Sequence, residues 1–350
     1  MSRSLQRFDY CAAALAGLML LASQTLLAVE LPLPSPTQTQ AGNSSEIGTG
    51  LVSGTQGTEF ASIAAQPAEE TFQTEAYSEE TWRDNFSIFT GINGAKQPQD
   101  LGINANLGGR LAFNSGFALS RDRGIGLQVG VAYDYSQNAV GVLKFIDGTR
   151  SREQLFTTVG VFQRHDSGIN WALGYDILNQ NYFDNFLLTQ WRGRIGYQWN
   201  EYNEFGVWGA VRDRQDDGSI LGFVPVHLRT INQANFFWRH TWETGPQTMM
   251  WAGLASSHSK NIFVLPIDEM TGVTPIIGAS INVPLNDWLS IYGETNLILP
   301  GDSGTVDAFL GFTITPSGGA KAAPYRRFAP MLPTGGSPSM AVDLQGPGII

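Results

Sequence analysis

The stretch RIGYQWNEYNEFGVWGAVRDR, residues 194–214, alternates apolar and polar side chains on both sides of a polar knot, NEYN. Before the knot, Ile195, Tyr197 and Trp199 share one parity. After it, the alternation restarts at Phe205, with arginines, glycines and a glutamate on the other parity. Because side chains of a β-strand alternate between its two faces, the stretch predicts two strands joined by a tight turn.

The same alternation recurs along the middle of the chain. We count twelve such segments, at residues 85–93, 102–113, 125–136, 153–164, 169–178, 187–199, 204–213, 226–240, 247–257, 274–283, 288–299 and 306–315. From the fourth segment onward, short links such as 165–168 alternate with longer links such as 179–186, whereas link 114–124 is long although it falls on the short side. This order is typical of an up-and-down sheet whose two ends face different surroundings.

Two features of these segments favour a membrane barrel over a soluble sandwich. Most segments are about ten residues long, which suits a tilted strand that crosses a bilayer, whereas strands of soluble proteins average about five or six. Tryptophans lie beside the short links, as expected of an aromatic girdle at a membrane interface. They are Trp171, Trp199, Trp242 and Trp288. Since no unpaired strand edge can face lipid, we predict an all-β fold: a closed antiparallel up-and-down transmembrane β-barrel of about twelve strands, with the apolar parity facing lipid.

The first 28 residues predict a signal peptide. Arg3 and Arg7 precede the apolar run 11–22, which is short for a spanning helix of about 20 residues. An N-terminal membrane anchor is the alternative.

Two low-complexity segments flank the predicted barrel of residues 85–315. Residues 29–84 predict an acidic, disordered arm, since positions 29–80 hold eight glutamates and no lysine or arginine. Residues 316–350 form a tail rich in proline and glycine. An even number of strands places both tails on the side of the short links, which in bacterial barrels is the periplasm.

Alternating strands such as GLQVGVAYDYS (126–136) and RIGYQW (194–199), the export signal and the short-turn, long-loop order resemble the small outer-membrane β-barrels of Gram-negative-type bacteria. The chain is most similar to the functionally uncharacterised outer-membrane barrels common in planctomycetes, over about residues 85–315. The resemblance implies outer-membrane lipid and the barrel-insertion machinery as partners. The chain departs from most such barrels because Phe312-Thr313-Ile314 is followed by a tail instead of ending the protein.

Composition excludes several classes of function. The net charge of −10 argues against a nucleic-acid partner, which would need clustered lysines and arginines. The one cysteine, Cys11, leaves with the signal peptide, so the mature chain has no thiolate for a metal or for catalysis. The four histidines are not clustered, and we expect no metal site and no cofactor.

The polar parity would line the lumen with arginines and carboxylates. The candidate lumen and selectivity residues are Arg164, Arg192, Arg194, Arg212, Arg229, Arg239, Asp134, Asp176, Glu294 and Asp307. Rows of guanidinium groups opposite carboxylates would favour anions or zwitterions in a narrow pore. The alternative is a lumen crossed by salt bridges. The number of strands does not predict whether the lumen is open or plugged, because twelve-stranded barrels fall between filled eight-stranded and open sixteen-stranded ones.

No residue pattern predicts an enzyme. His165 lies in the short link RHDSG, where Asp and Ser favour a turn. His258 in SSHSK faintly resembles the Ser/His pairs of outer-membrane lipid hydrolases, but no second catalytic element accompanies it. Two functions remain. One is a porin-like channel that passes small solutes by passive diffusion, and the other is a closed barrel that acts as a structural membrane anchor or contacts partners through periplasmic tails.

Overall fold

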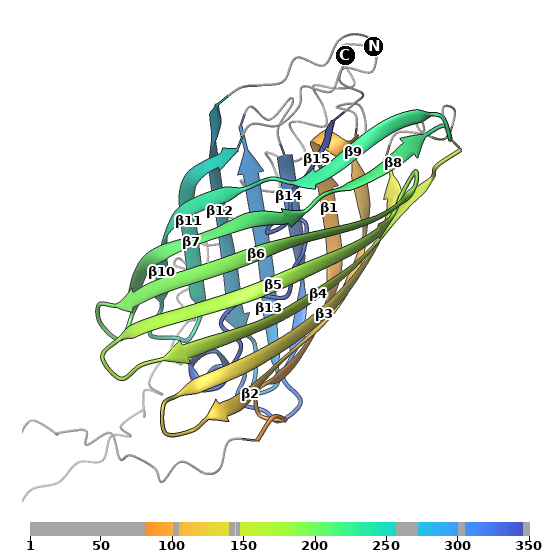
Figure 1. Cartoon of the computed structure of the whole chain (residues 1–350). Helices are drawn as coiled ribbons and strands as arrows, with labels where there is room; N and C mark the ends of the chain where they lie inside the picture. The colour runs from red at the N-terminus through yellow and green to blue at the C-terminus, as the bar shows by residue number, and fades with distance from the viewer. Residues whose placement is uncertain are drawn as a thin grey trace, which may run out of the picture.

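Twelve strands form a closed antiparallel barrel in the computed structural model, which describes residues 81–100, 105–139, 144, 148–256, 272–299 and 305–345 (Figure 1). The barrel strands are β1 (Phe86–Lys96), β2 (Asn106–Ser120), β3 (Ile125–Asn138), β4 (Ser151–Arg164), β5 (Ile169–Asn181), β6 (Asn185–Gln198), β7 (Asn203–Arg214), β10 (Gln233–Thr241), β11 (Gln247–Ser256), β12 (Val273–Pro284), β13 (Leu289–Ile298) and β14 (Thr305–Ile314). The predicted signal peptide and the arm as far as residue 80 lie outside these ranges. The predicted closed up-and-down barrel is confirmed.

Each barrel strand pairs with its neighbour along the chain except at two places. β7 pairs with β10 because β8 and β9 leave the ring, and β1 pairs with β14 to close it. At this seam Gly91 faces Gly311, and a Cβ on either glycine would overlap the opposite backbone. The two glycines therefore allow the first and last strands to approach closely.

The apolar parity faces outward, as predicted. In β3, Val129, Val131 and Tyr133 are exposed, while Gln128 and Asp134, on the other parity, are buried inside the ring. The same pattern, apolar outside and polar inside, is what a barrel in a bilayer requires. The fold is therefore a transmembrane β-barrel. Among the described residues, no helix has the length and apolar character needed to cross a membrane.

Five short turns lie at one end of the barrel, which we call the short-turn end. They are residues 121–124, 165–168, 199–202, 242–246 and 285–288. The link predicted to be long at 179–186 is wrong, because β5 and β6 both extend into it and leave only residues 182–184 as a short turn at the opposite end. Trp199 and Trp288 lie in two of the five turns of the short-turn end with 71% and 51% of their surface exposed, and Trp171 and Trp242 are half-buried beside them. The four tryptophans thus share one end, and their role at a membrane interface stays a prediction.

The prediction of a long link at 114–124 is wrong, because most of these residues belong to β2. β2 continues to Ser120, and the turn is tight, with Gly124 at a φ of 63° and its N–H donated to the Arg121 carbonyl. The sequence pattern fades in the second half of β2 because Asn114 and its inward neighbours contact another part of the chain rather than a regular polar lumen. The Asn114 amide, for example, donates to the backbone carbonyl of Leu332.

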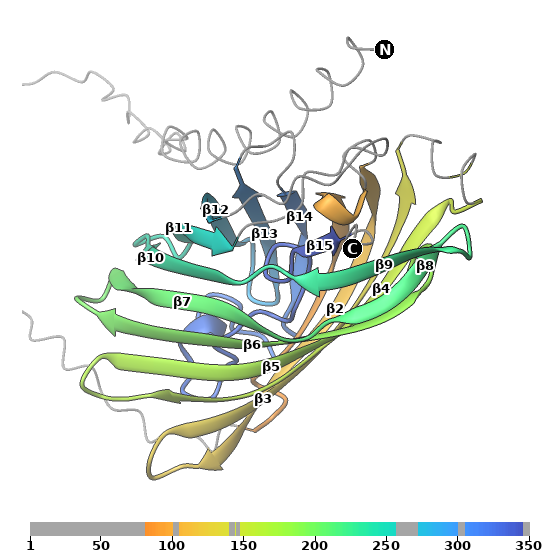
Figure 2. The ribbon, with the colours of Figure 1, turned by 45° about the horizontal axis from the view of Figure 1, so that its top comes forward.

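The C-terminal tail runs inside the barrel, which the sequence did not predict. It leaves β14 at the short-turn end, forms the short 3₁₀ helix η2 (Ala323–Tyr325), and ends in β15 (Val342–Gln345) at the opposite, long-link end (Figure 2). Most residues from Phe328 to Leu344 are buried. The prediction that both tails lie at the short-turn end is therefore wrong for this one. We call residues 316–345 the lumen segment.

A small second sheet covers the long-link end. β8 (Asp216–Ile220) and β9 (Val224–Thr230) form a hairpin, and β15 pairs antiparallel with β9. The predicted strand 226–240 is therefore two strands, of which only β10 belongs to the ring, and the predicted link 213–225 contains β8. Apolar side chains of all three strands pack with residues of β5 and β6 into a buried core, which includes Leu178, Phe186, Leu188, Ile220, Val226, Leu228, Met340, Val342 and Leu344.

Candidate functional site: the occupied lumen

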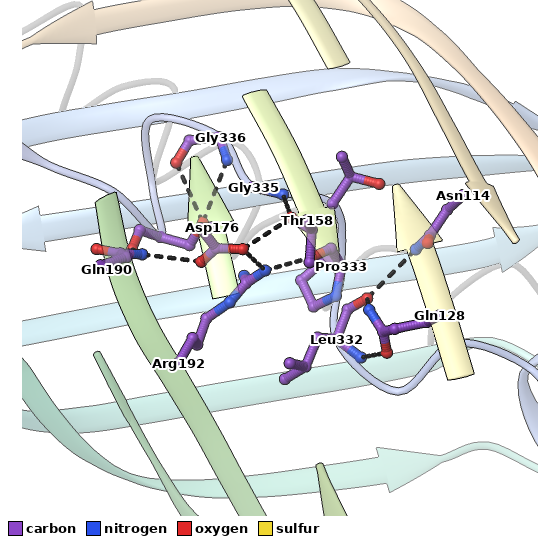
Figure 3. A network of polar contacts seen from close by, with 12 residues as sticks. Asn114, Gln128, Thr158, Asp176, Gln190, Arg192, Leu332, Pro333, Gly335 and Gly336 are labelled. Atoms are coloured by element: carbon purple, nitrogen blue, oxygen red, sulfur yellow. Dashed lines mark hydrogen bonds and ion pairs between the residues drawn. The ribbon is translucent and has the colours of Figure 1, made fainter. Parts of the chain in front are cut away.

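Side chains of the barrel wall hold the lumen segment mainly by its backbone. The Arg192 guanidinium donates to the Pro333 carbonyl over 2.7 Å, and the Gln128 amide donates to the Leu332 carbonyl over 3.0 Å (Figure 3). The Thr158 hydroxyl accepts the Gly335 N–H at 2.8 Å. Closer to the long-link end, Gln190, Gln233 and Asn296 donate to two further carbonyls, those of Ser339 and Pro338.

This mode of contact follows from the composition of the segment. Proline has a carbonyl but no N–H, so a proline-rich chain offers more acceptors than donors. The wall offers amide and guanidinium donors on its inward parity, which match those acceptors. The polar side chains that face the lumen therefore also form the hydrogen bonds that the buried backbone of the lumen segment needs.

Most predicted lumen charges are paired across the wall. Arg192 contacts Asp176 at 3.0 Å. Both carboxylate oxygens of Asp134 accept a hydrogen bond from Arg110 at 2.9 Å. Arg194 contacts Glu204 at 3.1 Å. Arg239 also pairs with Glu204 in the wall, whereas Arg229 of β9 pairs with Asp343 of the lumen segment, and Arg152 pairs with Asp100 in the link after β1.

The other predicted lumen residues have different surroundings. Arg164 donates to the backbone carbonyls of Arg327 and Ala329 at the short-turn end. Asp307 accepts from the Gln97 amide at 3.0 Å, and Glu294 accepts from the Tyr292 hydroxyl at 3.0 Å. Arg212 is half-buried near the end of β7, where its backbone N–H donates to the Asn232 side chain. All ten candidates thus lie on the barrel wall or on β9 beside it, but they form separate contacts instead of one continuous row.

Five partners were missing from the predicted set: Arg110, Arg152, Glu204, Asp100 and Asp343. The first three occupy the polar parity of β2, β4 and β7, so alternation alone could have found them. The last two had no signal, because Asp100 lies in the link after β1 and Asp343 lies in the lumen segment.

Asp100 anchors the link between β1 and β2 to the wall. It lies in the 3₁₀ helix η1 (Pro98–Asp100), outside the spanning strands, and burial raises the pKa of its carboxyl, an effect that nearby Arg152 opposes. The carboxyl also accepts the Asn106 amide at 2.7 Å and the Tyr182 hydroxyl at 3.1 Å. At the other end of the barrel, hydrogen bonds from Thr81 hold the pKa of Asp84 below its usual value.

A family match covers the barrel and most of the lumen segment, residues 85–342. The chain belongs to DUF6666, a family of unknown function. The match continues past β14 as far as the first residue of β15, so the barrel and the segment inside it belong to one family unit. Among curated protein sequences, none matches this chain.

Solved structures with a similar fold include outer-membrane channels. The COG4313 outer membrane channel from Pseudomonas putida F1 is 11% identical, with 69% of this chain and 99% of that chain covered and a TM-score of 0.48. The KdgM porin is 10% identical, with coverages of 65% and 98% and a TM-score of 0.36. The translocator domain of the autotransporter NalP from Neisseria meningitidis is 10% identical, with coverages of 66% and 87% and a TM-score of 0.40. These likenesses concern the fold.

Histidines and carboxylates do not gather into a metal site within the described ranges. His165 is exposed in its turn, where its Nδ1 lies 2.9 Å from the Ser167 hydroxyl and accepts the Ser167 N–H. These contacts are the local hydrogen bonds expected of a turn. His258 lies outside the described residues.

Proposed function

We propose that this protein is a porin-like channel for small solutes, held closed by its own lumen segment. The observation that carries the proposal is the path of residues 316–345, which cross the lumen from one end to the other and bond to the wall through their backbone. The channel would open when this segment moves out and water replaces its carbonyls as the partner of the wall.

The lumen segment can leave without breaking the barrel. The ring closes through β1 and β14, and β15 pairs with β9, which is not part of the ring. The segment is joined to the barrel wall through Thr315, directly after β14. Its departure would leave a wall of amides, hydroxyls and paired charges, which water can solvate.

In this proposal solutes pass by diffusion, and the arginines of the wall set the preference among them. Arg192 and Arg110 would each keep a carboxylate partner after the segment leaves, but they would lose the carbonyls that now occupy their remaining donors. Exposed guanidinium donors in a narrow lumen attract anions and zwitterions.

In the same proposal the barrel lies in the outer membrane, inserted by the barrel-insertion machinery, with its short-turn end in the periplasm, because bacterial barrels have short periplasmic turns. The N-terminal arm would then be periplasmic. β15 would lie on the side of the cell surface, because it is at the long-link end. The likeness to planctomycete barrels stays a prediction.

This topology predicts which sites react with a membrane-impermeant maleimide. In intact cells we expect labelling of Gln345→Cys, in β15, and of Phe223→Cys, at the exposed tip of the β8–β9 hairpin. Glu201→Cys, in a short turn, should react only after lysis. Labelling of Glu201→Cys in intact cells would reverse the orientation, and labelling of Phe223→Cys without Gln345→Cys would place the lumen segment elsewhere.

A disulfide tether tests whether movement of the segment opens the channel. A Cβ at Gly335 would lie 3.3 Å from the Thr158 hydroxyl oxygen, which suits a disulfide between Thr158→Cys and Gly335→Cys. The chain without its predicted signal peptide has no other cysteine. In planar bilayers we expect conductance steps from the reduced double variant and none from the oxidised form. The single variant Gly335→Cys, treated with the same oxidant, is the control.

A closed barrel that serves as an anchor is the second candidate, and the core at the long-link end favours it. Met340, Val342 and Leu344 of the lumen segment are buried there with the β8–β9 hairpin. Removing them from that core would cost free energy, about 1.5–3 kcal/mol for each large apolar side chain. Silence of both the reduced and oxidised forms, from barrels shown to be inserted, would decide for the anchor.

A further inference from the structure

We propose that the short-turn half of the barrel contains a binding site for a small organic monocarboxylate. The site is a cavity of about 280 Å³ between the lumen segment and the wall, which we call the vestibule. Its rim includes Asp84, Thr315 and Ala320 at the short-turn end, and its deeper wall includes Phe89 and Phe309. A ligand could therefore enter from that end while the lumen segment stays in place, so binding does not require the channel to open.

The charged groups around the vestibule favour an anion. Four arginines line it, Arg110, Arg164, Arg194 and Arg239, whereas Asp84 at the rim is its one lining carboxylate. Arg110 is balanced by Asp134, but Arg194 and Arg239 share the single carboxylate of Glu204. The four guanidinium groups thus outnumber the carboxylates of Asp84, Asp134 and Glu204 by one, and a single surplus positive charge matches a monoanion better than a dianion.

Arg194 also has a hydrogen-bond donor that is not used within the part of the chain that the structure describes. Its side chain is only 9% exposed, and its Nε–H has no acceptor among the described residues. A buried donor without a partner is costly, so a ligand that supplied an acceptor would gain more than the usual energy of a hydrogen bond. The guanidinium is held in place by Glu204 and by the Phe237 ring, whose centre lies 4.3 Å away. A fixed planar cation suits a carboxylate, which accepts two hydrogen bonds in one plane.

The rest of the wall favours a ligand with an apolar body. Phe89, Tyr292 and Phe309 pack against one another with ring centres 5.2–6.1 Å apart, and Met249 and Met331 complete this side. An aromatic ring could join such a cluster edge to face. The volume lies just below the range of ordinary ligand pockets, about 300–1,000 Å³, which indicates an acid with one ring rather than a larger molecule.

Titration calorimetry with phenylacetate, and with neutral phenylacetamide as the matched probe, tests the site in the refolded full-length mature chain. We expect one phenylacetate per barrel and at least about tenfold weaker binding of phenylacetamide, since charge-assisted hydrogen bonds are lost. Arg239→Gln removes the surplus charge but keeps the Arg194–Glu204 pair, and should weaken phenylacetate binding by at least about tenfold. Arg214→Gln, an equal charge change at an exposed position of the long-link end, should bind as the parent does.

Ser280→Phe gives a test that leaves the charges unchanged. Ser280 lines the vestibule, and a phenyl ring there would occupy its volume, so we expect phenylacetate binding to be lost while the barrel still folds by circular dichroism. Absence of phenylacetate binding to the parent chain would overturn the proposal. Binding that Arg239→Gln and Ser280→Phe both leave unchanged would also overturn it, because the acid would then bind elsewhere.

Discussion

Ending the chain at Thr315 should convert a closed barrel into an open one. Without residues 316–350 no other described part of the chain crosses the lumen, whereas the ring of twelve strands keeps every ladder, including β1 with β14. We expect the mean current per inserted barrel to rise at least about tenfold, because a block favoured by only about 1.4 kcal/mol already keeps the pore closed nine-tenths of the time. Planar-bilayer recordings at matched numbers of inserted barrels give the measurement.

A chain that ends at Gln345 is the matched control. It is shorter than the parent but keeps the whole lumen segment and β15, so its current should equal that of the full chain. Truncation at Thr315 also removes buried apolar side chains, and the shortened barrel should unfold at lower urea concentration. A folded, inserted barrel ending at Thr315 that carries no current would show that another part of the chain closes the lumen.

Replacing Arg110 by methionine should be among the most destabilising single changes in the wall. Arg110 and Asp134 are each at most 3% exposed, and the guanidinium also donates to the Gly335 carbonyl at 2.7 Å. Arg110→Met leaves the Asp134 carboxylate buried without its cation, which typically costs about 3–5 kcal/mol of unfolding free energy. Urea unfolding followed by tryptophan fluorescence in lipid vesicles measures this loss.

Two further variants separate the pair from its single charges. The double variant Arg110→Met/Asp134→Leu removes both charges and should recover most of the lost stability, because an apolar pair of similar size replaces a buried ion pair at little cost. Arg214→Met, which breaks the exposed contact with Asp216 at 3.8 Å, should cost less than about 1 kcal/mol. A loss in Arg110→Met no larger than that in Arg214→Met would mean that water or another group already stabilises Asp134.

The ion pairs also decide between the two predictions for the arginines that line the lumen. The sequence left two readings open, free guanidinium rows or salt bridges, and the structure contains salt bridges at Arg192, Arg194, Arg229 and Arg239. Opposite charges lie close together because the inward parity of adjacent strands places them side by side: Arg110 faces Asp134 in the β2–β3 register, and Arg239 faces Glu204 in the β7–β10 register. Selectivity can therefore come from the arginines only where their charge exceeds that of the carboxylates.

Alternation with a period of two was sufficient to predict the barrel wall. It defined which residues face outward and the number of ring strands, because lipid imposes one requirement on every second residue wherever a strand crosses. It failed where that requirement ends. Asn114 and Gly116, in the second half of β2, face the lumen segment, and β8 and β9 lie above the ring, so their patterns follow local contacts instead.

The sequence by itself thus determined a closed transmembrane barrel with a polar interior, since each strand reports its surroundings through its own residues. The tertiary structure alone decided what fills that interior. A proline- and glycine-rich segment has the same composition whether it stays in solvent or crosses a lumen. Its position depends on carbonyls of residues such as Leu332 and Pro333 meeting donors on Gln128 and Arg192, more than a hundred residues away. No local pattern records such contacts, because they exist only once the wall has closed.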